Sequence, residues 1–151
     1  MPGLWFEDFA VGAVFDHPIR RTVTEMDNTL FCAITMNPAA IHLDAEASKA
    51  TVFAQRIVNS LYTLGLMIGI SVHDTTLGTT VANLGMEKVR LPKPVFHGDT
   101  LHVRTTVLDT RASASKPSQG IVTFRHEAFN QHNDLLASCE RAALMLRRPM
   151  G

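Results

Sequence analysis

Hydrophobic and polar positions follow two different periods along the chain. From residue 25 to about residue 72 the apolar positions recur at helical spacing, whereas from residue 79 onward they alternate with polar positions. Period-two alternation is typical of antiparallel strands with one buried face. The strand-like runs are residues 19–24, 79 onward, 101–107, 122–127 and 139–146. The pattern therefore predicts one early strand, a largely helical segment and then further strands, about five strands in all.

Residues 57–72 are apolar on nearly every side, which predicts a helix enclosed by other structure. A membrane span needs roughly 20 apolar residues, and this stretch is shorter and interrupted by Asn59, Ser60 and Thr63. One such helix fills the concave face of a curved sheet. We therefore expect an α+β architecture in a single domain over residues 1–151, with an antiparallel sheet wrapped around a central apolar helix.

Shorter signals predict the remaining elements. Thr24 and Asp27 have the spacing of a capping box, which predicts a helix running through Ile34. An irregular stretch follows over residues 36–44, and a second helix is expected to begin near Asp44. Small residues, Pro and Gly cluster over residues 112–120, which indicates a hairpin loop.

Composition excludes several classes of protein. A chain of 151 residues with 46% apolar residues suffices for one core. Its 14 basic and 14 acidic residues cancel, which argues against a nucleic-acid binder and an electrostatically held membrane protein. Cys32 and Cys139 are too few for a disulfide scaffold, so a reducing cytoplasm is the expected compartment. The N-terminus lacks the pattern of a signal peptide.

The segment from residue 31 to residue 44 reads FCAITMNPAAIHLD. It resembles the hydratase motif of the MaoC-like dehydratases, the family of (R)-specific enoyl-CoA hydratases. The positions that match the motif are Phe31, Ile34, Thr35, Ile41, His42 and Asp44. Residues 4–12, 58–61 and 90–101 resemble further segments of the family in the correct order. The resemblance implies the hot-dog fold.

A lone hot-dog sheet exposes an edge strand, and pairing two sheets edge to edge removes that liability. We therefore expect a homodimer at least.

The motif also departs from the family pattern. Asn37 stands where the family has its catalytic aspartate, and His42 is retained five residues later. The same Asn-Pro-x-x-x-His form resembles a branch associated with the hydration of mesaconyl-CoA, methylmalyl-CoA and itaconyl-CoA. That resemblance implies a branched C4–C5 dicarboxylic acyl group as one candidate substrate.

Adding water to an enoyl thioester requires a base, a proton for C2 and donors that stabilise the enolate oxygen. A histidine titrates near neutral pH, so we assign the acid/base role to His42. An asparagine cannot titrate, so Asn37 is expected to hold the water through its carbonyl oxygen or to donate its NH₂ to the oxyanion. The alternative is that Asp44 supplies the second proton step, unless it simply caps the following helix.

The start of the central helix offers hydrogen-bond donors for the thioester carbonyl. In the family a glycine lets the backbone approach the thioester at this place, and Ser60 occupies it here. A backbone N–H of Ser60 or Leu61 is therefore the oxyanion candidate, and the Asn59 side chain is a further substrate contact. For the Ser60 hydroxyl a role as plain N-cap is at least as well supported as a catalytic role, so only the backbone of Ser60 is assigned.

Structural explanations compete for the other candidates. Asn before Pro is a common turn residue, and an isolated histidine is more often structural than catalytic. His102 and His126 lie on strand-like runs, where a solvated face is the default interpretation. The histidines show no spacing typical of metal ligands, so no metal site and no cofactor besides the CoA of the substrate are expected.

Three functions remain open. The leading hypothesis is a reversible enoyl-CoA hydratase. The second is a hot-dog thioesterase, which usually has a carboxylate on the central helix, and residues 57–72 contain no Asp or Glu. The third is a non-catalytic acyl-CoA-binding subunit, which the replacements at Met36 and Asn37 motivate.

Overall fold

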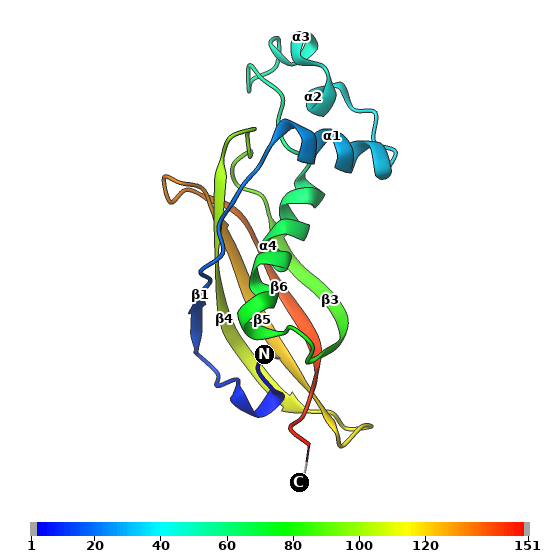
Figure 1. Ribbon diagram of the computed structural model, residues 1–151, viewed down its shortest axis with the longest axis vertical. Coiled ribbons are helices and arrows are strands. Elements are labelled where there is room, and N and C mark those ends of the chain that lie inside the picture. The colour runs from blue at the N-terminus through cyan, green and yellow to red at the C-terminus, as the bar shows by residue number, and fades with distance from the viewer. Residues whose placement is uncertain (1–2, 150–151) are drawn as a thin grey trace.

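A computed structural model describes residues 3–149 and shows one antiparallel sheet curved around one long helix (Figure 1). The strands are β1 (Val14–Asp16), β2 (Arg21–Thr22), β3 (Thr80–Arg90), β4 (Thr100–Ala112), β5 (Gln119–Phe129) and β6 (Leu135–Leu146). Their order in the sheet is β1-β4-β5-β6-β3, with β2 pairing separately with β4. This arrangement confirms the predicted α+β hot-dog architecture, including the hairpin between β4 and β5.

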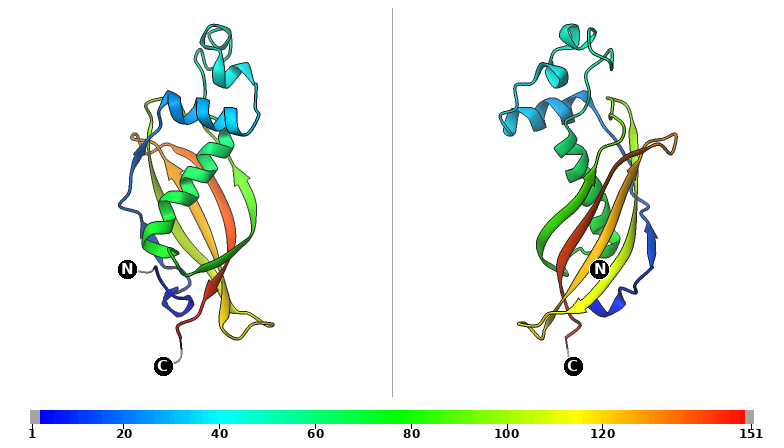
Figure 2. Two further views of the ribbon diagram at one scale, coloured as in Figure 1. Left: turned by 45° about the vertical axis from the view of Figure 1, so that its right-hand side comes forward. Right: turned by 180° about the vertical axis from the view of Figure 1, so that it is seen from behind.

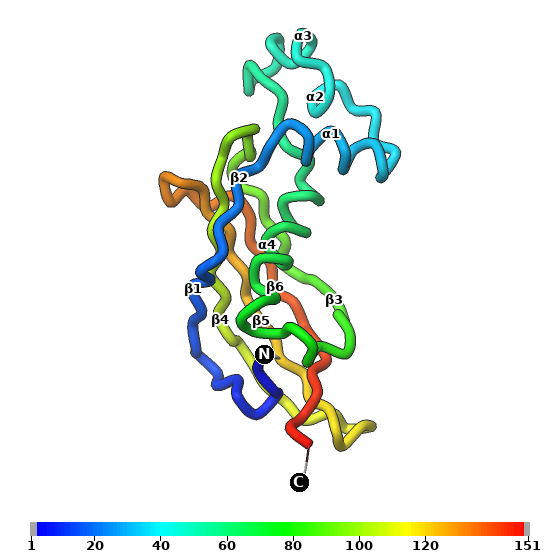
Figure 3. The backbone as a smooth tube through the Cα atoms, in the orientation of Figure 1, coloured from blue at the N-terminus to red at the C-terminus, as the bar shows by residue number. Residues whose placement is uncertain are grey.

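The helices divide into a central helix and a cap. They are η1 (Phe6–Asp8), α1 (Glu25–Ile34), α2 (Ala40–Leu43), α3 (Ala45–Ser48) and α4 (Ser60–Thr75). Helix α4 lies across the concave face of the sheet. Helices α1, α2 and α3 gather at one end of the sheet and together form the cap (Figures 1 and 2). The chain trace shows the segment between α1 and α4 looping beyond the end of the sheet (Figure 3).

The sequence signals for the starts of α1 and α3 are confirmed. The Thr24 hydroxyl accepts the Asp27 N–H at 3.2 Å, and the Asp27 carboxylate accepts the Thr24 N–H at 2.8 Å, which completes the capping box of α1. Asp44 begins α3, because its Oδ1 accepts the N–H groups of Glu46 and Ala47 at 2.9 Å each.

The central helix starts three residues later than the hydrophobic pattern predicts. Val58 N–H donates to the Val95 carbonyl at 2.8 Å, and Ile57 forms a β-bridge with Phe96, so this part of the chain is extended. Asn59 is the N-cap, which corrects the alternative that Ser60 caps the helix. None of the helices within residues 3–149 has the length and apolar character needed to cross a membrane.

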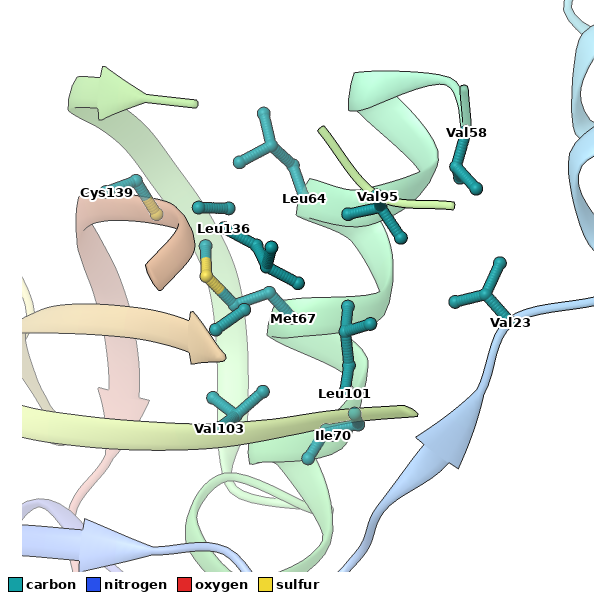
Figure 4. Close-up of a cluster of buried hydrophobic side chains, with 12 residues drawn as sticks. Val23, Val58, Leu64, Met67, Ile70, Val95, Leu101, Val103, Leu136 and Cys139 are labelled. Atoms are coloured by element: carbon teal, nitrogen blue, oxygen red, sulfur yellow. The ribbon is translucent and has the colours of Figure 1, made fainter. Parts of the chain in front are cut away.

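One face of α4 builds the main core. Leu64, Met67 and Ile70 project from α4 toward the sheet, where they meet Val103 and Leu136 (Figure 4). Burial of such side chains contributes about 1.5–3 kcal/mol each and holds the helix on the sheet. The opposite face is not covered in the single chain. Leu61 is 64% exposed, and both helix glycines, Gly65 and Gly69, are exposed.

A chain of buried polar groups crosses the same concave face. Arg141 Nε on β6 donates to His126 Nε2 on β5 at 3.1 Å, and His126 Nδ1 lies 2.8 Å from Thr105 Oγ1 on β4. Thr105 Oγ1 lies 2.7 Å from His17 Nε2, and His17 Nδ1 lies 2.6 Å from an Asp74 oxygen on α4. The chain therefore ties three neighbouring strands to the last turn of the central helix.

The two end groups of this hydrogen-bonded network, Arg141 and Asp74, determine which atom donates in each bond. A guanidinium only donates and a carboxylate only accepts. One arrangement gives each of these four contacts a donor and an acceptor: Arg141 Nε donates to His126, His126 to Thr105, Thr105 to His17 and His17 to Asp74. In this arrangement both imidazoles donate from Nδ1 and accept at Nε2.

His126 is 1% exposed, which corrects the prediction of a solvated face. Burial, and then the Arg141 guanidinium, lower the pKa of His126 from its ordinary 6.5 to about 3. The unfolded chain therefore binds a proton at this histidine between about pH 3 and 6.5, whereas the folded chain does not. Stability rises with pH across this window and is lost as the pH falls through it.

We predict that His126→Asn weakens the pH dependence of stability. Asn keeps a donor in place of Nδ1 but does not titrate. Between pH 4 and 6 the free energy of unfolding of the wild type should rise with pH more steeply than that of the variant, by about 1.4 kcal/mol per pH unit. Denaturant unfolding at each pH measures both slopes. His132→Asn, at an exposed position, is the control, and equal slopes for wild type and His126→Asn would contradict the prediction.

Candidate active site

His42 lies on α2 with its imidazole half-buried. Its Nδ1 is 2.8 Å from the carbonyl oxygen of Ile57. Since a carbonyl only accepts, Nδ1 carries the proton and Nε2 carries the lone pair. Nε2 makes no hydrogen bond within residues 3–149. The imidazole is therefore held in the tautomer and orientation of a general base, with its basic nitrogen available.

A buried amide, Asn28 on α1, holds the segments around His42 together. Asn28 is 0% exposed. Its Nδ2 lies 3.2 Å from the carbonyl of His42, 3.1 Å from that of Ile57 and 3.0 Å from His97 Nε2. Its Oδ1 accepts the backbone N–H of Asn59 at 2.9 Å. One side chain thus links α1, α2, the N-cap of α4 and the turn before β4.

Sequence reasoning missed Asn28. The available signal was its position four residues before Cys32, since residues at this spacing share one face of a helix. Both side chains are 0% exposed, and the Cys32 thiol contacts Asn28 Oδ1 at 3.8 Å. A polar amide on the buried face of a helix needs partners, and here they are backbone groups of the candidate site.

His97 joins the same network from the turn before β4. The two hydrogens of Asn28 Nδ2 are shared among three acceptors, and since this nitrogen only donates, His97 Nε2 is an acceptor and its proton is on Nδ1. Burial, and then the nearby Arg56 guanidinium, lower the pKa of His97. His97 is therefore held neutral.

Asn37 forms the turn between α1 and α2. Its Oδ1 accepts the Ala39 N–H at 3.0 Å, and the preceding Met36 adopts a left-handed conformation with φ of 58°. The carbonyl oxygen is therefore already engaged. The Asn37 NH₂ group makes no hydrogen bond within residues 3–149, which leaves it as the part of this side chain available to a ligand.

Of the two backbone N–H groups predicted to hold the oxyanion, that of Ser60 is available to a ligand and that of Leu61 is not. The Leu61 N–H is taken by Asn59 Oδ1 at 3.0 Å. The Asn59 amide nitrogen contacts Cys32 Sγ at 3.7 Å, so both ends of this side chain are used inside the protein. Ser60 is exposed, and as the first helical residue its N–H has no acceptor within the helix.

A cavity of about 230 Å³ opens beside Ser60. It lies between the segment that leads into α4, the first turn of α4 and the segment that follows β3. Its lining residues are Phe53, Ile57, Val58, Ser60, Thr63, Leu91, Pro92, Lys93, Pro94, Val95 and Leu136. Ile57 connects the cavity with the base, because its carbonyl holds His42.

The remaining candidates are Asp44, Cys32 and Cys139. Asp44 is engaged as the cap of α3. Cys32 and Cys139 are buried free thiols, as expected. Within residues 3–149 no three His, Cys, Asp or Glu side chains form a group suited to a metal ion.

Comparison with known proteins places this geometry in a family. The model of the family described as MaoC like domain matches residues 8–128. The chain belongs to this MaoC-like family. Mesaconyl-CoA hydratase from Cereibacter sphaeroides is 32% identical over 146 residues, which cover 97% of this chain and 42% of the relative. The chain thus spans less than half the length of that relative.

Solved structures agree with the family assignment. The MaoC-like dehydratase from Rhodospirillum rubrum is 30% identical with a TM-score of 0.85, covering 98% of this chain and 100% of that one. A Mycobacterium tuberculosis protein described as a double hot-dog fold is 25% identical with a TM-score of 0.89, covering 99% of this chain and 46% of that one. These likenesses confirm the MaoC-like resemblance and the hot-dog fold.

We predict that Asn28→Ala destabilises the protein by about 2–4 kcal/mol, because several buried backbone groups lose their partner. Asn28→Asp keeps the acceptor for Asn59 N–H but removes the donor for the carbonyls of His42 and Ile57, so it should also destabilise. Denaturant unfolding measures both changes.

Thr29→Ala is the control for Asn28, because Thr29 is exposed on the same helix. It should change the free energy of unfolding by less than about 0.5 kcal/mol. An Asn28→Ala variant as stable as this control would show that the network does not hold the cap.

Proposed function

We propose that this MaoC-like chain is a hydro-lyase that adds water reversibly to the double bond of an enoyl-CoA thioester. The observation that carries the proposal is the Nε2 of His42, which makes no hydrogen bond within residues 3–149. Its Nδ1 is held by Ile57, a residue that also lines the apolar cavity beside Ser60. The name of the relative, mesaconyl-CoA hydratase, supports a branched dicarboxylic acyl group as the substrate.

The proposed reaction needs only one titrating group. His42 Nε2 takes a proton from water, and the oxygen of that water forms a bond to C3. The electron pair of the double bond moves onto the thioester oxygen, where the Ser60 N–H stabilises the enolate at the positive end of the α4 dipole. The imidazolium then returns the proton to C2, so the elements of water are added to one face.

Asn37 serves this reaction as a hydrogen-bond donor. Its carbonyl oxygen is engaged with Ala39, so we assign to its NH₂ group the task of holding the attacking water or the enolate oxygen. The steps use acid–base chemistry and hydrogen bonds, so we propose that no cofactor besides the CoA of the substrate takes part.

A thioesterase remains the alternative enzyme and is less favoured by the geometry. A hot-dog thioesterase usually has a carboxylate on the central helix. Helix α4 carries one carboxylate, Asp74, in its last turn, where it pairs with His17 at 2.6 Å. The position of Asp74 therefore supports a structural role.

We further propose that the chain acts as a homodimer in the cytoplasm. Strand β3 is an edge of the sheet with exposed apolar side chains, since Val81, Leu84 and Met86 are 43%, 50% and 37% exposed. The uncovered face of α4 offers more apolar surface. Pairing with a second copy would bury both, and the free thiols of the two cysteines suit a reducing compartment.

We predict that the wild type consumes the conjugated thioester of at least one of crotonyl-, mesaconyl- and itaconyl-CoA. His42→Ala should lower kcat on that substrate about a hundredfold or more, the usual contribution of one general base. Loss of the enoyl thioester absorbance measures the rate. Thiol release from a saturated acyl-CoA in place of hydration would indicate the thioesterase.

Because His42 also bonds to Ile57, the His42 result needs a folding control. His42→Asn retains a side-chain donor near the position of Nδ1 and lacks the base. Equal stability of this variant and the wild type, with activity lost, would assign the loss to chemistry. Hydration at the wild-type rate by a folded His42 variant would refute the role, and a wild type that binds acyl-CoA without turnover would indicate a binding subunit.

The role of Asn37 is tested by separating its two functional groups. Asn37→Asp keeps the oxygen that accepts Ala39 N–H and removes the donor, so the turn should persist while kcat falls about tenfold to a thousandfold. Asn37→Ala should lose both activity and some stability. Steady-state kinetics with thermal unfolding measures both effects. Wild-type activity of Asn37→Ala, together with loss of activity in Asp44→Ala, would move the role to Asp44.

A further inference from the structure

The cavity beside Ser60 has a small volume and almost uniformly apolar walls. Its volume of about 230 Å³ lies below the range of roughly 300–1,000 Å³ that is typical of pockets for drug-sized ligands. A short acyl group therefore suits it better than a long chain. Ser60 and Thr63 are its two hydroxyl residues, and Lys93 carries the only formal charge among the described lining residues.

The chain holds Lys93 at the edge of this cavity by two means. Lys93 lies between Pro92 and Pro94, which restrict the backbone on both sides of it. Its ammonium also contacts an Asp134 oxygen at 2.5 Å, and the other Asp134 oxygen accepts from Asn130 Nδ2 at 3.2 Å. The lysine is thereby anchored near the cavity while its side chain remains 55% exposed.

An anchored ammonium at an apolar cavity selects for negative charge. The Lys93 ammonium has three N–H donors, and Asp134 engages one of them. An uncharged acyl chain gains nothing from the remaining donors, whereas a carboxylate receives charge-assisted hydrogen bonds from them. Ser60 and Lys93 line the same cavity, so an acyl group that enters it from a thioester held at Ser60 meets Lys93 among the lining residues.

We infer that Lys93 binds a carboxylate on the acyl group and thereby makes the site selective for dicarboxylic acyl-CoA thioesters. The inference rests on the proposed function for the placement of the thioester at Ser60. The other source of anionic oxygen in the ligand is a phosphate of the CoA moiety. The CoA phosphates are common to every acyl-CoA. Two ligands that differ in the acyl carboxylate therefore distinguish the two sources.

Binding of succinyl-CoA and butyryl-CoA tests the inference without any turnover. Both acyl groups are saturated and have four carbons, and only succinyl-CoA has a free carboxylate. Titration calorimetry should show that Lys93→Met weakens succinyl-CoA binding about tenfold to a hundredfold and changes butyryl-CoA binding less than twofold. Lys93→Arg should retain most of the preference for succinyl-CoA.

Lys49→Met is the matched control, because Lys49 is an exposed lysine paired with Glu46 outside the cavity. It should leave the affinity for both ligands unchanged. Equal weakening of both ligands by Lys93→Met would assign Lys93 to a CoA phosphate and overturn the inference, as would unchanged binding of both. A Lys93-dependent preference for succinyl-CoA in a protein that hydrates no enoyl-CoA would support the inference and refute the proposed function.

Discussion

The candidate site depends on one buried amide that satisfies backbone groups from separate segments. The helices α2 and α3 have four residues each, too few to be stable by themselves. Asn28 joins α2 to the start of α4 by bonding to the backbone of His42, Ile57 and Asn59. The orientation of the His42 imidazole follows, because the Ile57 carbonyl that fixes Nδ1 is one of the groups that Asn28 holds.

The packing of α4 on the sheet, which supports the site, is stabilised by a second polar network. The hydrogen-bonded chain from Arg141 to Asp74 lies between two apolar clusters, one around Met67 and one around Phe124. Apolar packing has no direction, whereas these hydrogen bonds fix β6 against β5, β5 against β4, and the last turn of α4 against the sheet through His17. The Asn28 network orients the His42 imidazole, and the network from Arg141 to Asp74 fixes α4 against the sheet.

Asparagine at position 37 changes what the site is able to do. An aspartate there would bring a second titrating group, whereas Asn37 brings a donor whose partner oxygen already shapes the turn. In the proposed reaction, proton transfer is then concentrated on His42. A single imidazole suffices for a reaction in which the proton taken from water is returned to the neighbouring carbon.

The sequence by itself determined the curved sheet, the central helix, the caps at Thr24 and Asp44, and the family, because each rests on short-range periodicity or on a contiguous motif. It did not reveal Asn28, whose partners lie far away in the chain, nor the burial of His126, since alternation alone does not say which face a strand turns inward. Only the tertiary structure decided which polar atoms were already occupied. That distinction separates Asn59, which caps α4 with its side chain, from Ser60, whose N–H remains open to a ligand.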